Sequence, residues 1–180
     1  ALKEGAKVRL LTRSGQDWTR RFADIAASIA ALPVKTAALD GEVVVYDARG
    51  RSDFGALQQA LGPEARFSKA SASAQRMVYV AFDLMHLDGW DLRAAQLVAR
   101  KEALRLLLCR RASADPIVRF SDHFAGRAED MLREACALGL EGIVAKRSDA
   151  PWVSGRSRTS RVAVPGSSID TVNRSATIRS

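Results

Sequence analysis

The sequence lacks long hydrophobic runs. No apolar stretch approaches the roughly 18–20 residues that a helix needs to span a bilayer, and no signal-peptide pattern opens the chain. These absences predict a protein with no membrane partner. With 47% hydrophobic and 27% charged residues among 180, the composition is that of a folded globular chain rather than a disordered one.

Cysteine and histidine are scarce, with two of each. Cys109 and Cys136 lie in stretches with helical periodicity, and neither stands at metal-ligand spacing from His86 or His123. The pattern therefore gives no support to a Cys/His metal site. It favours two small, buried side chains in a reducing compartment.

Acidic residues are fewer than basic ones, 20 against 28, which gives a net charge of +8. Such a surface favours nucleic acid as a partner, because phosphate pairing and counterion release reward Lys and Arg. The signal is weakened by the last 27 residues (154–180), which carry five Arg and one Asp and so supply four of the eight charges.

Apolar periodicity predicts alternating strands and helices without internal repeats. Strands are expected at 7–12, 39–46, 77–84, 117–120 and 142–146, and helices at 18–32, 52–61, 97–108 and 128–138. Ser52 or Asp53 is a candidate helix cap, and Gly139 a candidate helix end. This order favours an α/β fold with a mixed sheet and outer helices. Residues 154–180 have no sustained period, which predicts flexibility with one short strand at 161–164.

Four stretches place charged or aromatic residues where a plain strand or turn does not need them. Glu42 opens the strand "EVVVY", where it is either a solvated end or a ligand. Phe82 in "FDLM" is either a core residue or a ring on which a base stacks. Glu141 and Lys146 in "GLEGIVAKR" are either solvated strand ends or parts of a metal and phosphate site, and Arg13 lies in a basic turn. Each stretch by itself leaves both interpretations open.

Six stretches in one order narrow the choice: "TRSGQDWT", "ALDGEVVV", "SDFGALQQAL", "FDLMHLDGWDLR", "RFSDHF" and "LGLEGIVAKRSDAPWVSGRS". From about Lys7 to Ser157, the chain resembles the adenylation (nucleotidyltransferase) domain of ATP-dependent DNA ligases. It is most similar to the ligase module of the bacterial multifunctional end-joining ligases, often called ligase D. The resemblance implies an α/β (α+β) fold of mixed, largely antiparallel sheets with flanking helices.

In that family a lysine attacks the α-phosphate of ATP, and the resulting lysyl-AMP passes AMP to the 5′-phosphate of a nick, which the 3′-hydroxyl then seals. The resemblance implies that Phe82 stacks on adenine, that Glu42 reaches the ribose, and that Lys146 and Arg13 contact the nucleotide or the 5′-phosphate. Glu141, with Glu42 in some states, resembles the carboxylates that bind Mg²⁺ or Mn²⁺. The implied partners are nicked or broken duplex DNA and other end-joining domains or proteins, in the bacterial cytoplasm at the nucleoid.

The sequence departs from the family at both ends. The nucleophile motif Lys-x-Asp-Gly is missing, because the two Leu-Asp-Gly sequences are preceded by Ala38 and His86, and no lysine follows Lys146. We therefore expect residues 1–157 to form a partial adenylation domain. Residues 158–180 are expected to form a divergent, flexible tail that resembles out-of-frame translation, with no oligonucleotide-binding domain.

Two hypotheses remain. One is an enzyme fragment that cannot form the enzyme–AMP adduct alone, since the covalent step needs its nucleophile. The alternative is a non-catalytic remnant that binds nucleotide, DNA ends or a partner protein.

Overall fold

The computed structural model describes residues 1–47, 52–62, 77–109, 117–126, 142–154, 160–163 and 174–179, together with the single positions 130, 133 and 137. The described helices and strands are β1 (Leu2–Glu4), β2 (Lys7–Arg9), α1 (Ala23–Ala30), β3 (Thr36–Val45), α2 (Phe54–Leu61), β4 (Met77–Leu87), β5 (Trp90–Asp91), α3 (Leu97–Cys109), β6 (Val118–Phe120), β7 (Phe124–Gly126), β8 (Gly142–Lys146), β9 (Ser160–Ala163) and β10 (Arg174–Arg179). No helix in this part of the chain is long and apolar enough to cross a membrane.

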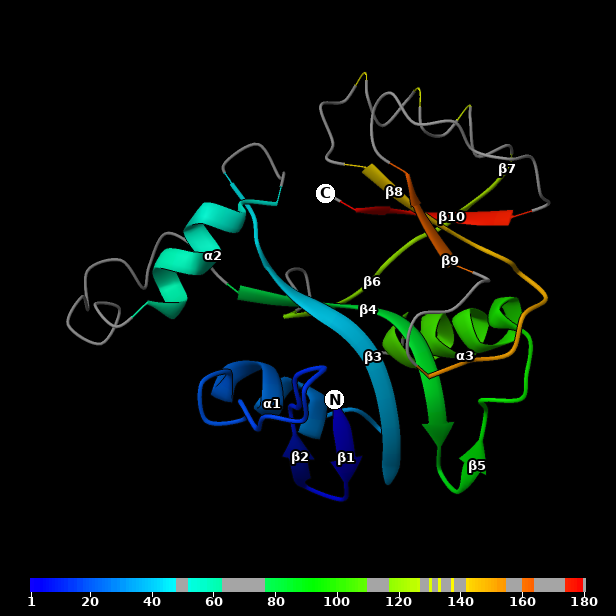
Figure 1. Cartoon of the computed structure of the whole chain (residues 1–180). Helices are drawn as coiled ribbons and strands as arrows, with labels where there is room; N and C mark the ends of the chain where they lie inside the picture. The colour runs from blue at the N-terminus through cyan, green and yellow to red at the C-terminus, as the bar shows by residue number, and fades with distance from the viewer. Residues whose placement is uncertain are drawn as a thin grey trace.

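Two long strands, β3 and β4, form the centre of the first sheet (Figure 1). The strand order is β2-β1-β3-β4-β5 with antiparallel neighbours, and β6 pairs with β4 in parallel. The valine-rich runs of β3 and β4 suit the half-buried pleated surface that this position requires. Asp88 and Gly89, with φ of 44° and 90°, close the β4–β5 hairpin in the left-handed backbone region that a tight turn of this kind needs.

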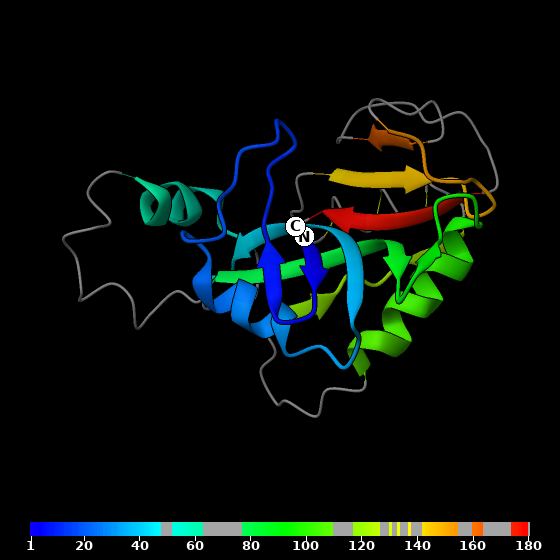
Figure 2. The ribbon, with the colours of Figure 1, turned by 90° about the horizontal axis from the view of Figure 1, so that it is seen from below.

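Helices α1 and α3 pack on one face of this sheet, and the second sheet lies over the other face (Figure 2). The core joins Ile25 and Ile29 of α1 and Leu104 of α3 to Leu39 of β3 and Ala81 of β4, all nearly inaccessible to water. The second sheet has the order β7-β10-β8-β9 with antiparallel pairs. The candidate site lies between the first sheet and the segment that follows β8.

The predicted fold class, a mixed α+β chain with largely antiparallel sheets, is confirmed by this arrangement. Asp53 is the N-cap of α2, since its carboxylate accepts a hydrogen bond from the backbone N–H of Ala56 at 2.8 Å. The helix predicted from residue 18 begins only at Ala23 as α1, because residues 18–22 form turns. The predicted helix 128–138 and its proposed end at Gly139 lie mostly outside the described residues.

The expectation that both cysteines are buried is wrong for Cys109, which is exposed at the end of α3. It is the last residue of α3 and directly follows Leu107 and Leu108, the last buried residues of that helix. Cys136 lies outside the described residues. In the tail, β9 at Ser160–Ala163 corresponds to the expected short strand, and β10 adds a second strand that the composition did not indicate. The flexibility of the remaining tail stays a prediction.

Candidate nucleotide-binding cleft

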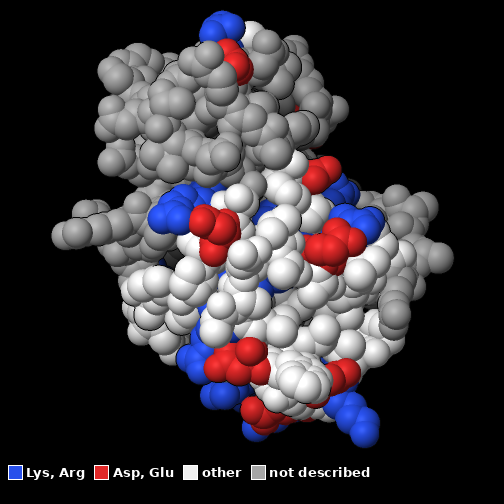
Figure 3. All heavy atoms as spheres, turned by 90° about the vertical axis from the view of Figure 1, so that its right-hand side faces the viewer, with Lys and Arg blue, Asp and Glu red and all other residues white. Residues whose placement is uncertain are grey.

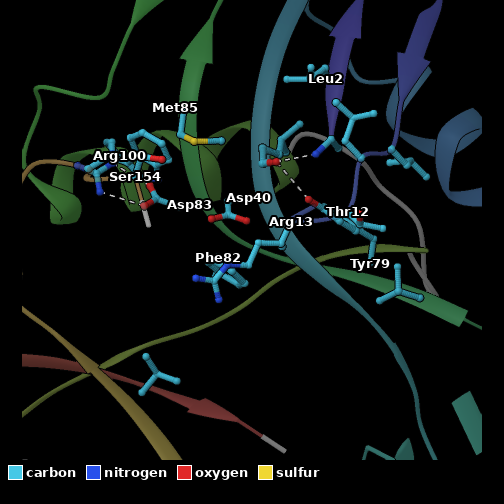
Figure 4. Close-up of a pocket in the computed structure, with 18 of the residues that line it drawn as sticks. Leu2, Thr12, Arg13, Asp40, Tyr79, Phe82, Asp83, Met85, Arg100 and Ser154 are labelled. Carbon is cyan, nitrogen blue, oxygen red and sulfur yellow. Dashed lines mark hydrogen bonds and ion pairs between the residues drawn. The ribbon is translucent and has the colours of Figure 1, made fainter. Parts of the chain in front are cut away.

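A cleft of about 1140 Å³ opens between the first sheet and the segment that follows β8. Its walls come from the turn after β2, the middle of β3, the second half of β4, and residues 144–154, parts of the chain that are far apart in sequence. Arg13, Asp40, Phe82 and Asp83 are among the residues that line it (Figure 4). The cleft therefore combines an aromatic ring with charges of both signs.

Phe82 and Lys146 meet in this cleft. The ammonium Nζ of Lys146 lies 4.6 Å from the centroid of the Phe82 ring, in a cation–π contact. Asp40 pairs with Asp83 and Gly41 with Ala81, so Phe82 is the extra residue of a β-bulge in β4, and its ring lines the cleft while Ala81 and Asp83 on either side are buried. The open interpretation of Phe82 as an ordinary core residue therefore does not hold, because its half-buried ring lines the cleft.

Arg13 reaches the cleft from the turn between β2 and α1. The turn is closed by hydrogen bonds from the N–H of Gly15 to the carbonyl of Thr12 and from the N–H of Thr12 to the carbonyl of Gln16, both 2.9 Å. Gly15 has φ of 84°, a conformation that favours glycine and explains the Ser-Gly turn signal. The exposed Arg13 side chain is thus carried at the rim by a well-defined loop.

Asp40 is a cleft residue that the sequence interpretation left out. Burial raises the pKa of its carboxyl group, while the positive charge of Lys146 acts in the opposite direction. Its neighbour Gly41 passes so close to Tyr79 that an added Cβ would lie 2.6 Å from the ring atom Cζ. In the sequence, Asp40 is the acidic residue directly before the glycine of "ALDGE", the only local hint of a special role.

Glu42 lies between Gly41 and Val43, which both line the cleft, but it is not itself among the lining residues. It is half-buried and pairs with Val80 across the sheet. Burial raises the pKa of the nearby Tyr46, the positive charge of Arg119 lowers it, and the negative charge of Glu42 raises it. The Arg119 guanidinium carbon lies 5.3 Å from the centroid of the Tyr46 ring. Glu42 thus lies beside the cleft, and its role as a nucleotide ligand stays a prediction.

The proposed metal site depends on Glu141, which lies outside the described residues. Among those that are described, no three His, Cys, Asp or Glu side chains come together as a metal-binding group. Asp83, the acidic residue paired with Asp40 across β3 and β4, is bonded to Arg100 through both carboxylate oxygens. The described carboxylates alone therefore do not form a metal centre, and metal binding through Glu42 and Glu141 stays a prediction.

On the side of the molecule that carries α3 and β5, the described residues form no single basic patch (Figure 3). Figure 3 shows acidic and basic side chains next to each other there, around an uncharged centre. Exposed ion pairs of the described chain include Arg93–Asp91, Arg105–Glu102 and Arg147–Asp149. The net positive charge is locally neutralised at such pairs, which makes this side a poor candidate for a phosphate backbone.

Comparison with known proteins also indicates a nucleotide-using enzyme family. The family model described as "ATP dependent DNA ligase domain" matches residues 1–162. The chain is 43% identical over 154 residues to the multifunctional non-homologous end joining protein LigD of Pseudomonas aeruginosa, covering 86% of this chain and 17% of that protein. It is 34% identical over 154 residues to a probable DNA ligase of Beutenbergia cavernae, covering 86% of this chain and 29% of that one.

Solved structures agree. Mycobacterial DNA ligase D complexed with ATP and MES matches with a TM-score of 0.73 and 25% identity, over 91% of this chain and 50% of that one. The ligase domain of LigD from M. tuberculosis matches with a TM-score of 0.71 and 26% identity, over 91% and 49%. The chain spans about half of these solved chains and less than a third of the two curated relatives. On the family match and these relatives, the chain belongs to the ATP-dependent DNA ligase domain family.

Proposed function

We propose that the chain is the adenine-nucleotide-binding part of a bacterial ATP-dependent DNA ligase, whose complete form seals nicks or breaks through lysyl-AMP and DNA-adenylate intermediates. The observation that carries the proposal is the Lys146–Phe82 contact inside a cleft with Arg13 at its rim. An aromatic face accepts a base, and the two cations can pair with the phosphate attached to it. The likeness to a ligase D that was solved with ATP supports the same assignment.

Glu42 and Glu141 complete the proposal as ligands of the ribose and of Mg²⁺ or Mn²⁺. Carboxylate oxygens suit these hard cations, and a metal of this kind would neutralise charge on the reacting phosphates. Nicked or broken duplex DNA, held near the bacterial nucleoid, is the proposed substrate. Other end-joining domains or proteins are proposed partners, because one relative is a multifunctional non-homologous end joining protein.

Titration calorimetry with AMP and ATP tests the binding step. We expect saturable binding that Phe82→Leu and Lys146→Met each weaken by about tenfold, since stacking and a charge-assisted contact each contribute on the order of 1–3 kcal/mol. Lys35→Met, a change at an exposed lysine that does not line the cleft, is the matched control. Absence of binding by the unmodified chain, or equal losses in Lys35→Met, would refute the assignment of the cleft.

The 180 residues contain no Lys-x-Asp-Gly, so we propose that they do not form an enzyme–AMP adduct by themselves. Incubation with α-labelled ATP and Mg²⁺, followed by denaturation, measures this directly. We expect no retained label, and a label that survives denaturation would contradict the proposal. Salt-sensitive binding to nicked DNA by a chain that binds neither AMP nor ATP would instead fit a non-catalytic remnant.

A further inference from the structure

Two consecutive residues of α3 contact two consecutive residues of β4 beneath the cleft. Arg100 donates from Nε to one carboxylate oxygen of Asp83 at 2.8 Å and from Nη2 to the other at 2.9 Å. Lys101 donates from Nζ to the carbonyl of Ser121 at 3.0 Å and to that of Phe82 at 3.4 Å. Arg100 and Lys101 are only 3% and 2% exposed, so these contacts are made away from water.

The first turn of α3 also binds the segment that follows Lys146. The N–H groups of Leu97 and Val98 donate to the carbonyls of Ala150 and Ser148, both at 3.0 Å. The first-turn N–H groups of a helix have no partner within it, so this segment takes the place of a capping side chain. Nη1 of Arg100 donates to the same Ala150 carbonyl at 3.3 Å.

Arg100 therefore joins the two walls of the cleft. Among the described residues, its side chain is the one with hydrogen bonds both to the strand that carries Phe82 and to the segment that follows Lys146. Asp83 is adjacent to Phe82, and Ala150 is four residues beyond Lys146. The fork of a guanidinium fixes direction as well as distance, which a flexible ammonium would not do.

Stability alone is a weak reason for this pair. Removing two charges from water offsets much of their attraction, so a buried ion pair can often be replaced by well-packed apolar side chains without loss of stability. A rigid link between the walls, in contrast, would be lost in that replacement. Replacing the pair by apolar side chains can therefore separate its effect on stability from its effect on ligand binding.

We propose that the Asp83–Arg100 pair is a positioning element of the nucleotide site, which holds the strand of Phe82 against the segment that follows Lys146, so that the ring can accept a base while the ammonium reaches the phosphate of the same nucleoside monophosphate. The inference rests on the proposed function of the cleft. Asp83 and Arg100 also line the cleft, but the guanidinium of Arg100 bonds to Asp83 and Ala150, so we assign its effect to the placement of Phe82 and Lys146 rather than to contact with the ligand. Loss of the pair should weaken the phosphate contribution to binding while leaving base stacking in place.

The test compares AMP with adenosine in the double variant Asp83→Leu/Arg100→Met, with unfolding by urea measured on the same samples. The unmodified chain should bind AMP more tightly than adenosine. In the double variant the AMP affinity should fall about tenfold, the scale of one charge-assisted contact, while the adenosine affinity and the urea midpoint stay near the parent values. Glu102→Leu/Arg105→Met removes an exposed pair from the same helix and should change neither affinity.

Three results would overturn the inference. If the chain binds AMP but the double variant keeps the parent ratio of AMP to adenosine affinity, the pair is structural only. Equal losses for AMP and adenosine would also contradict it. If the unmodified chain binds neither compound, the proposed function fails and the inference falls with it.

Should the double variant not fold, Arg100→Lys keeps the charge but loses the fork, and the same ratio is measured. A reduced ratio supports the positioning role, and an unchanged ratio refutes it.

Discussion

Gly41→Ala should destabilise the chain at the centre of the first sheet. Gly41 lies between Asp40 and Glu42 on β3, and a Cβ there would stand 2.6 Å from Cζ of Tyr79 and 2.6 Å from the carbonyl oxygen of Val80. Ordinary carbon contacts are about 3.5–4.0 Å long, so one of the neighbours must move by about 1 Å. Neither moves freely, because Tyr79 is buried and its hydroxyl donates to the Leu39 carbonyl at 3.2 Å, and the other atom is backbone.

Overpacking of this kind costs about 2–3 kcal/mol. The unfolded chain loses freedom on the change from Gly to Ala, which returns about 0.4–1 kcal/mol. The expected net loss is therefore about 1–2.6 kcal/mol in the free energy of unfolding. Because the strain lies next to Asp40, we also expect weaker AMP binding in the folded variant.

Urea unfolding followed by far-ultraviolet circular dichroism measures the loss, with the slope of the transition as a check on two-state behaviour. Gly62→Ala is the matched control, since a Cβ there would lie 3.4 Å from the nearest atom and the backbone φ is −68°. It should stay within about 0.5 kcal/mol of the parent. A Gly41→Ala chain as stable as Gly62→Ala would refute the packing argument.

Three further outcomes are expected. Asp53→Ala should cost about 1 kcal/mol in urea unfolding, because it removes the N-cap of α2, whereas Asp53→Asn should restore most of the loss. Tyr79→Phe should cost on the order of 1 kcal/mol, since it leaves the Leu39 carbonyl without its hydroxyl donor, and an unchanged midpoint would contradict that. Burial, then Lys146, lowers the pKa of Lys101 from 10.5 to about 8. The unfolded chain therefore binds more protons between these values, so the free energy of unfolding should rise with pH across this window in the parent relative to Lys101→Met, and equal slopes would count against it.

Long elements with local signals were predictable from the sequence. The valine-rich strands β3 and β4, the helix α3 and the Asp53 cap each follow from a period or a cap within a few residues. Strands β1 and β5, of three and two residues, carry too few positions for a period to stand out. They are strands because their neighbours in the sheet supply their hydrogen bonds, and a local sequence pattern does not indicate such pairings.

The site was predictable in its residue types and less so in its geometry. Motif likeness selected Phe82 and Lys146 separately. They lie on strands of two different sheets, β4 and β8, and the packing of these sheets brings the Lys146 ammonium to 4.6 Å from the Phe82 ring. Phe82 is the extra residue at the register shift between Asp40 and Gly41, and a single sequence does not reveal such a bulge. No local pattern indicates a role for Arg100, because its partner Asp83 lies on another element.

The contact between Lys146 and Phe82 has a consequence for how a nucleotide would enter. The ammonium stands over the ring, where a stacking base would compete with it. A partly exposed cation–π contact contributes about 0.5–1 kcal/mol, and base stacking about 1–3 kcal/mol. Exchange of one for the other is therefore favourable, and it releases the ammonium toward the phosphate of the same ligand. Adenosine, which has no phosphate, gains only the difference between these two contributions. The preference for AMP over adenosine should therefore shrink about tenfold in Lys146→Met, with Arg13 among the remaining cations.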